Sequence, residues 1–189
     1  MDGEVFALDH GPLAHENRLP ALAEMLGAQS RIDSRETFNA YCRETCRAWA
    51  ELYGTTGRPA HFRELLEQIE RGGNNIIPTA WGGVVVTLHE HPRVEKYLVV
   101  QRGGYLALEK HEQKDEHLTI EEGAGLLLSR LAPDQPLAVR AVAPGDEFHF
   151  APGQAHCLIG ADNLLVFERS TDSKGMDQDL IFIYEPDGA

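Results

Sequence analysis

The sequence predicts a mainly β protein, built as a β-sandwich or small barrel, with a helical extension at its N-terminus. Up to about residue 73, apolar residues recur at the three- and four-residue spacing of a helix face. From Asn74 onward, short apolar runs are separated by Gly- and Pro-containing turns. No helical pattern lies among these runs, which excludes a Rossmann fold or a β/α barrel. We therefore expect a helical extension over residues 1–73 and a β-domain over residues 74–189.

Three helices are expected in the extension. A short one runs from Pro20 to Gly27, and a stronger one is capped by Asp33 or Ser34, with Glu36 in capping-box position after Asp33. A third ends at the glycine pair 72–73. The apolar stripe of the second helix comprises Phe38, Tyr41, Cys42, Thr45, Trp49, Leu52 and Tyr53, and that of the third comprises Phe62, Leu65, Leu66 and Ile69.

The β-domain is expected to hold many short strands. Stacking or closing such strands removes exposed sheet edges, which favours a sandwich or barrel. The expected strands cover residues 84–88, 96–101, 105–108, 117–120, 125–129, 137–142, 147–150, 164–168 and 180–184.

Composition limits the possible partners and the compartment. The 189 residues include 17 Lys and Arg against 30 Asp and Glu, a net charge of −13, which argues against general binding to nucleic acids or anionic membranes. No apolar stretch is long enough to span a bilayer, and the N-terminus lacks the basic start of a secretory signal. Three cysteines are an odd and sparse set, typical of a reducing compartment. We expect a cytoplasmic protein.

Two stretches carry candidate metal ligands. In residues 104–125, Glu109 and His111 are two apart in an expected strand and so share one face, and Glu116 opens the next strand after a turn. Residues 144–156 contain Gly-Asp and Pro-Gly turns and end on His156. Histidine and carboxylate groups that face inward from neighbouring strands are typical ligands of Mn, Fe, Zn or Ni.

These two stretches resemble the two sequence motifs of the cupin superfamily, and the resemblance covers about residues 77–186. Within that superfamily, the first stretch is most similar to the cupin of type II mannose-6-phosphate isomerases and related sugar isomerases. The similar run is Leu108-Glu109-x-His111-x-x-Lys114-x-Glu116-His117. The chain departs from that pattern in two places, since Glu109 stands where those isomerases have Gln and Lys114 where they have Arg.

The resemblance implies a cupin-type double-stranded β-helix, or jelly-roll barrel, and a metal-dependent isomerase that converts an aldose to a ketose, acting on a sugar or sugar phosphate. It implies a divalent ion, Mn, Fe or Zn, bound by Glu109, His111, Glu116 and His156. The base that moves the proton is left open among Glu109, Lys114 and His117, although strand alternation puts His117 on the face opposite Glu116. Cationic anchors for an anionic substrate would come from Lys110 and Arg169, with Arg102, Lys114 and Lys174 as further candidates.

A rival register of the first motif is also possible. It runs from Gly83 through His89 and His91 to Glu95, and it would supply more histidines. That register would favour a second hypothesis, a metal-dependent oxygenase. A third hypothesis is a cupin that binds a small carbohydrate without catalysis. In each case the partner is a small molecule, and the helical extension packs on its own barrel or on a second subunit of a homodimer.

Overall fold

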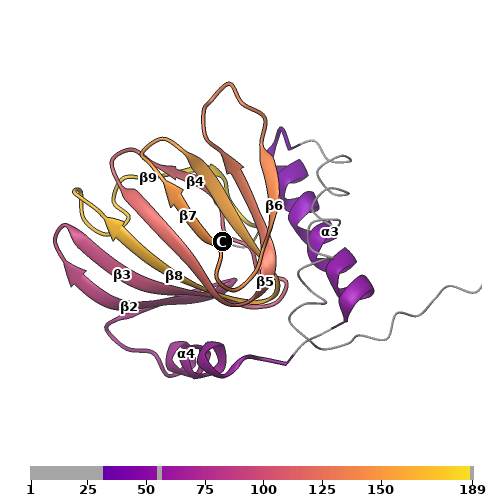
Figure 1. The fold of residues 1–189 in the computed structure, drawn as a ribbon, viewed down its shortest axis with the longest axis horizontal. Helices are drawn as coiled ribbons and strands as arrows, with labels where there is room; N and C mark the ends of the chain where they lie inside the picture. The colour runs from indigo at the N-terminus through magenta and orange to yellow at the C-terminus, as the bar shows by residue number, and fades with distance from the viewer. Residues whose placement is uncertain (1–31, 55–56, 188–189) are drawn as a thin grey trace, which may run out of the picture.

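The computed structural model describes residues 32–54 and 57–187. The short helix expected from Pro20 to Gly27 lies outside this range. The mainly β class is confirmed: nine strands form a curled antiparallel sheet with two helices beside it. Figure 1 shows α3 and α4 on two different sides of the curled sheet.

The first described helix, α3, spans Arg35–Tyr53. Ser34 caps it, because its side chain accepts from the backbone N–H of Thr37 while the Thr37 hydroxyl lies 3.0 Å from the backbone nitrogen of Ser34. The capping box therefore uses Ser34 and Thr37 instead of Asp33 and Glu36, which corrects the expected pair. The apolar stripe of α3 packs on the outside of the barrel, where Phe38 and Trp49 are fully buried.

The second helix, α4, spans Ala60–Arg71 and ends at Gly72, whose φ of 73° favours glycine. Its buried face meets β2 (Gly82–Glu90), β3 (Arg93–Val100) and β8 (Ala155–Thr171) in a separate apolar cluster. Since both helices share apolar clusters with the strands, the part of the expected extension that forms α3 and α4 packs on its own barrel.

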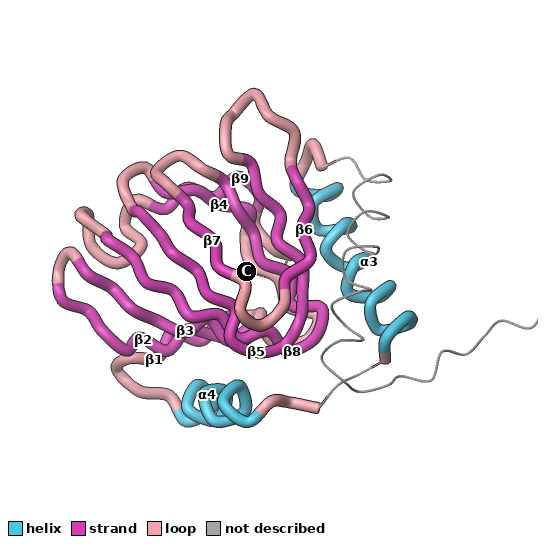
Figure 2. Tube along the Cα trace, viewed as in Figure 1, coloured by secondary structure: helices cyan, strands magenta, loops and turns pink. Residues whose placement is uncertain are grey.

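The nine strands form two layers that share their longest members (Figure 2). One layer has the order β1, β2, β3, then the second half of β8, the first half of β5, and β7. The other has the order β9, β4, then the first half of β8, the second half of β5, and β6. The strands are β1 Ile76–Thr79, β2 Gly82–Glu90, β3 Arg93–Val100, β4 Leu108–His111, β5 Asp115–Arg130, β6 Ala138–Val142, β7 Glu147–Phe150, β8 Ala155–Thr171 and β9 Leu180–Tyr184.

The long strand β5 replaces two expected strands. The pair Glu122-Gly123 resembles a turn in sequence, but the chain passes through it with a series of register shifts against β8 and continues. Gly123 has a φ of 84°, and a Cβ atom there would lie 2.1 Å from the carbonyl oxygen of Asn163. The bulged region lets one strand bend from one layer into the other.

An apolar cluster fills the space between the layers. Its members on strands come from β2, β3, β5, β6, β7 and β8 and include Leu98, Leu118, Leu127, Leu158 and Val166. Among the described residues, no helix is both long and apolar enough to cross a membrane.

Candidate metal centre and its cavity

A cavity of about 780 Å³ opens between the two layers. One part of its wall is apolar, with Trp81, Leu106 and Leu158 among its lining residues. The remaining wall is charged, and its side chains come from β3, β4, β5, β8 and the loop before β9. These charged lining residues are Lys96, Glu109, Lys114, Glu116, Glu168 and Asp177, with Glu185 and Asp187 near the C-terminal end.

Three of the predicted ligands meet at Glu116. Its Oε2 atom lies 3.3 Å from His156 Nε2 and 3.8 Å from His111 Nε2. All three side chains are buried, and Glu116 Oε2 has no hydrogen-bond partner among the described residues. The turn before β8 helps to place His156, because the backbone N–H of Gly153 donates to the carbonyl of His111 at 2.7 Å. Phe150 stacks on the His156 ring with centroids 4.2 Å apart.

Asp179 fixes the orientation of His111. Its Oδ1 atom lies 2.8 Å from His111 Nδ1, while its Oδ2 atom accepts from the backbone N–H groups of Gln113 and Lys114. A carboxylate accepts a hydrogen bond, so Nδ1 carries the hydrogen and Nε2, on the side of Lys114 and Glu116, keeps a free lone pair. A carboxylate behind a histidine is the arrangement that orients metal ligands in proteins.

Two buried lysines lie beside these donors. Lys114 Nζ is 2.6 Å from Glu168 Oε1 and 2.8 Å from Asp177 Oδ1, and Lys96 Nζ is 2.5 Å from Asp177 Oδ2 and 3.3 Å from Glu168 Oε2. The four side chains thus form a closed ring of alternating charge. Lys114 also approaches the donor set, at 3.4 Å from His111 Nε2 and 3.8 Å from Glu116 Oε1.

The ring keeps its members charged. Burial alone would favour the neutral carboxylic acids, but Lys96 and Lys114 outweigh it and lower the pKa of both Glu168 and Asp177. For the same reason, the two carboxylates overcome burial and raise the pKa of both lysines. Lys114 is therefore a fixed ammonium, which argues against the role of proton-accepting base left open for it by the sequence.

The four predicted metal ligands, His111, His156, Glu109 and Glu116, form a donor set whose pKa values are shifted toward the neutral forms. Burial lowers the pKa of His156 to about 3, with His111 and Lys114 adding to the effect, and burial and Lys114 lower that of His111. Both imidazoles are thus neutral and able to bind a metal. Burial raises the pKa of Glu109 to about 8 in spite of Lys96, and burial and Glu168 raise that of Glu116. Glu109 and Glu116, which lie outside the ring, therefore have too little positive charge around them to offset the cost of burying an ionised carboxylate.

The donor set fits a divalent ion. Lys96 and Lys114 already pair with Glu168 and Asp177, so Glu109 and Glu116 beside the two histidines are left with little compensating positive charge, which a divalent cation would supply. Atoms bound to one ion at about 2.1 Å lie roughly 3.0 to 3.5 Å apart, close to the two distances at Glu116 Oε2. The three donor atoms do not all lie within 4.8 Å of one another, so binding requires His111 and His156 to draw in toward Glu116.

The structure brings some of the other predicted residues to the cavity and leaves others outside. Glu109 lines it and pairs in register with His156 across β4 and β8. His117 is on the outer face, 59% exposed, so it is not placed to act as a base in this cavity. Arg169 is also outside and contacts Glu95 at 3.4 Å. Lys110 does not line the cavity, and neither do the weaker candidates Arg102 and Lys174.

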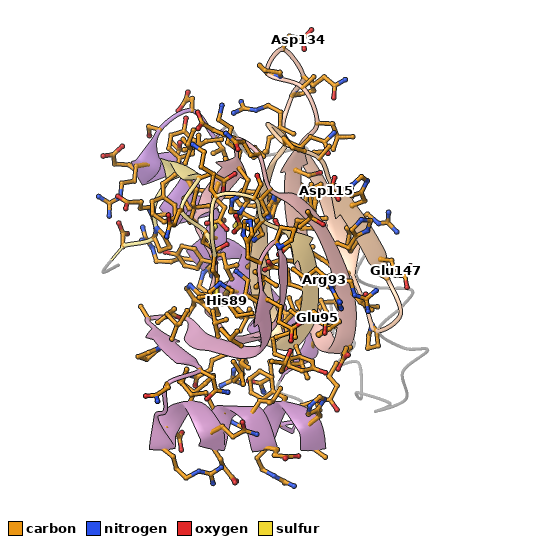
Figure 3. All side chains as sticks on the ribbon, turned by 90° about the vertical axis from the view of Figure 1, so that its left-hand side faces the viewer. His89, Arg93, Glu95, Asp115, Asp134 and Glu147 are labelled. Atoms are coloured by element: carbon orange, nitrogen blue, oxygen red, sulfur yellow. The ribbon has the colours of Figure 1, made fainter. Side chains whose placement is uncertain are left out.

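The rival register lies away from the cavity. His89 and His91 are exposed at the turn between β2 and β3, and Figure 3 labels His89 and Glu95 among the outer side chains. None of the rival residues lines the cavity. The rival register, and the hypothesis of a three-histidine oxygenase that it would favour, therefore have no support in the arrangement of these strands.

Sequence reasoning missed four residues of the candidate site: Lys96, Glu168, Asp177 and Asp179. Two of them carried a detectable signal. Lys96 is two and four residues from the buried Leu98 and Val100, and Glu168 is two residues from the buried Val166. Residues two apart on a strand lie on the same face, so strand alternation puts both charges on the inner face of the sheet. Asp177 and Asp179 lie in a loop whose course is set by hydrogen bonds to Asp172, and nothing in their local sequence indicates where they point.

No family model matches the chain, and no curated protein sequence matches it. Solved structures do match. The capsular polysaccharide assembling protein CapF of Staphylococcus aureus superposes with a TM-score of 0.51 at 15% identity, over 58% of this chain and 34% of CapF. An oxalate decarboxylase of Bacillus subtilis superposes with a TM-score of 0.50 at 18% identity, over 63% of this chain and 31% of its own. The matched region is about a third of each of those longer chains.

At this level of identity the likeness concerns the fold. Together with the two-layer topology, it shows that the chain adopts the double-stranded β-helix fold of the cupins, as the two motifs predicted. The class of protein is thus a cupin-fold barrel with two covering helices and a charged cavity.

Proposed function

We propose that this chain is a metal-binding cupin that isomerises a neutral sugar between its aldose and ketose forms. The observation that carries the proposal is the composition of the cavity: two neutral imidazoles and Glu116 form a donor set, and the lysine ring beside it is already balanced. His111, Glu116 and His156 would hold the ion. Mn, Fe and Zn all suit imidazole and carboxylate ligands. The Bacillus subtilis oxalate decarboxylase that shares the fold contains Mn(II) centres.

The charge of the cavity favours a neutral substrate. Lys96 and Lys114 are the basic residues among the described residues that line it, and each is paired with the buried Glu168 and the partly buried Asp177. Six acidic side chains line the same cavity. Apart from a bound metal ion, a phosphate group would therefore meet net negative charge and no unpaired cation among the described lining residues, and these side chains would not offset its desolvation. A sugar without phosphate meets neither obstacle.

The aromatic part of the cavity wall suits a sugar ring. Trp81 and Tyr105 line the cavity, and Phe182 contributes a side chain that is 51% exposed. Aromatic faces pack well against the C–H face of a pyranose, while polar groups fix the orientation of the hydroxyls. This combination of apolar wall and polar end is typical of small-molecule sites.

Isomerisation requires a proton to move between two adjacent carbons. A divalent ion bound at the donor set would supply positive charge for the two oxygens on those carbons. Glu109 lines the cavity next to His156, and burial raises its pKa to about 8. The positive charge of a bound divalent ion would favour its ionised form, which could then accept and return the proton. We assign it this role in preference to that of a fourth ligand. Lys114 contributes a fixed positive charge at the same end.

The test is an NMR assay of isomerisation with protein loaded with Mn²⁺ or Zn²⁺. Neutral aldoses and ketoses and their 6-phosphates serve as substrates, and Glu109→Gln is the variant. We expect turnover of a neutral sugar, at least a hundredfold slower in Glu109→Gln, with metal content unchanged. Turnover confined to phosphorylated sugars would overturn the substrate assignment, and binding of sugars without turnover would overturn the isomerase assignment.

A further inference from the structure

A second cluster of metal-binding side chains lies on the outer face of the barrel. Asp115 and His117 are two residues apart on β5 and point outward, while Glu116 between them points into the cavity. His149 on β7 is the register partner of His117. Residues directly opposite each other in an antiparallel pair have their Cβ atoms about 5 Å apart, so their side chains share one small area.

The donor atoms of this cluster are close together. His149 Nε2 lies 2.8 Å from Asp115 Oδ2, and His117 Nε2 lies 3.3 Å from Asp115 Oδ1. The two imidazole rings are stacked, with centroids 4.3 Å apart and an interplanar angle of 11°. Within the described part of the chain, this is the one group of three His, Cys, Asp or Glu side chains whose ligand atoms all lie within 4.8 Å of one another.

The surroundings leave the cluster open to an ion. The side chains of Asp115, His117 and His149 are 41%, 59% and 51% exposed. Arg169, the register partner of His117 on β8, contacts Glu95 on β3, on the side away from β7. Glu147 is two residues from His149 on the same strand and is exposed, so it adds negative charge to this side of the sheet. Figure 3 labels Asp115 and Glu147.

We infer that Asp115, His117 and His149 form a surface site for a divalent transition-metal ion of the zinc type. Two imidazole nitrogens and one carboxylate oxygen are the protein ligands of a tetrahedral Zn²⁺ site that keeps its fourth position for water. Imidazole ligands select Zn²⁺, Ni²⁺ or Cu²⁺ over Mg²⁺ and Ca²⁺. The site is separate from the cavity centre and does not depend on the proposed isomerase activity.

The test is isothermal titration of the untagged, metal-free full chain with Zn²⁺. We compare the wild type with His117→Ala and His149→Ala, and use His89→Ala as the matched control because His89 is another exposed strand histidine. Removal of a direct ligand is expected to weaken Zn²⁺ binding at the surface site by at least about tenfold. Removal of a group that only orients a ligand already lowers metal affinity by about 10- to 100-fold. His89→Ala is expected to leave every site unchanged.

The outcomes are distinct from those for the cavity. A Zn²⁺ equivalent that is lost in both His117→Ala and His149→Ala, and kept in His89→Ala, supports the surface site whether or not the cavity also binds metal. Zn²⁺-dependent shifts of the His117 and His149 ring signals in NMR spectra are expected at the same titration point. Identical isotherms for the wild type and both variants would overturn the inference.

Discussion

Asp179 lies 2.8 Å from His111 across a sequence separation of 68 residues, and its second oxygen accepts two backbone N–H groups. The same carboxylate therefore ties down the loop between β4 and β5 and sets which nitrogen of His111 carries the proton. The loop before β9 thus determines whether the histidine on β4 can bind a metal.

Exchanging this carboxylate for an amide should remove that control. In Asp179→Asn, the amide oxygen is expected to turn to the two backbone N–H groups, which leaves its NH₂ group facing His111 Nδ1. The imidazole must then carry its hydrogen on Nε2, the atom that faces Glu116, and cannot bind an ion through it. We expect the cavity affinity for Mn²⁺ or Zn²⁺ to fall about 10- to 100-fold, measured by titration.

Asp134→Asn, at the exposed tip of the β5–β6 hairpin (Figure 3), is the matched control. It removes the same charge from the chain far from His111. Equal metal affinity in Asp179→Asn and Asp134→Asn would show that Asp179 does not set the state of His111.

The ring of lysines and carboxylates predicts a pH-dependent contribution to stability. Lys96 and Lys114 lower the pKa of Asp177 in the folded chain, so its charge stabilises the fold above the unfolded pKa of about 3.9. This contribution is lost as the pH falls below that value toward the folded pKa. Asp177→Asn is expected to lower the free energy of unfolding at pH 7 by on the order of 2 kcal/mol. The substitution removes one of the two carboxylates that neutralise the buried Lys96 and Lys114.

Urea unfolding at a series of pH values measures this effect. The difference between the wild type and Asp177→Asn should be constant from about pH 7 to pH 5 and should shrink as the pH falls below about 4. A difference that stays constant down to the lowest pH at which both proteins fold would contradict the ion-pair account.

The bulge in β5 predicts a strong effect at Gly123. Its φ of 84° is unfavourable for other residues, and an added Cβ atom would lie 2.1 Å from the Asn163 carbonyl oxygen. Gly123→Ala is expected to lower the free energy of unfolding by more than about 2 kcal/mol, by thermal or urea unfolding. Gly57→Ala is the control, because a Cβ atom there meets nothing within 4 Å. Similar losses at both positions would contradict this account of the bulge.

Much of the fold could be predicted because it rests on local patterns. The stripes of α3 and α4, the turn residues and the two motifs all lie within short stretches, and the cupin-type barrel follows from them. The break expected at residues 122–123 was wrong because a bulge and a turn use the same kind of residue. The choice depends on pairing with β8, some 40 residues further along the chain, which no local pattern shows.

The candidate site was predictable only in part, for a related reason. His111, Glu116 and His156 lie in motifs, and the structure brings them together. Lys96 and Glu168 face the interior, but buried charges are rare enough that a charge in a strand is ordinarily read as solvent-exposed. Their burial depends on each other, since neither charge could be inside without the partner from a distant strand.

The most direct test of the account is the metal content of the untagged chain after loading with Mn²⁺ or Zn²⁺ and dialysis, measured by mass spectrometry in a His117→Ala background that removes the surface site. Into this background we add His111→Ala, His156→Ala or the control His89→Ala, with folding checked by circular dichroism. The account predicts one ion per chain in the background and the control, and its loss in the His111→Ala and His156→Ala variants. Folded variants that all retain the same metal content, or a background chain that takes up none, would contradict it.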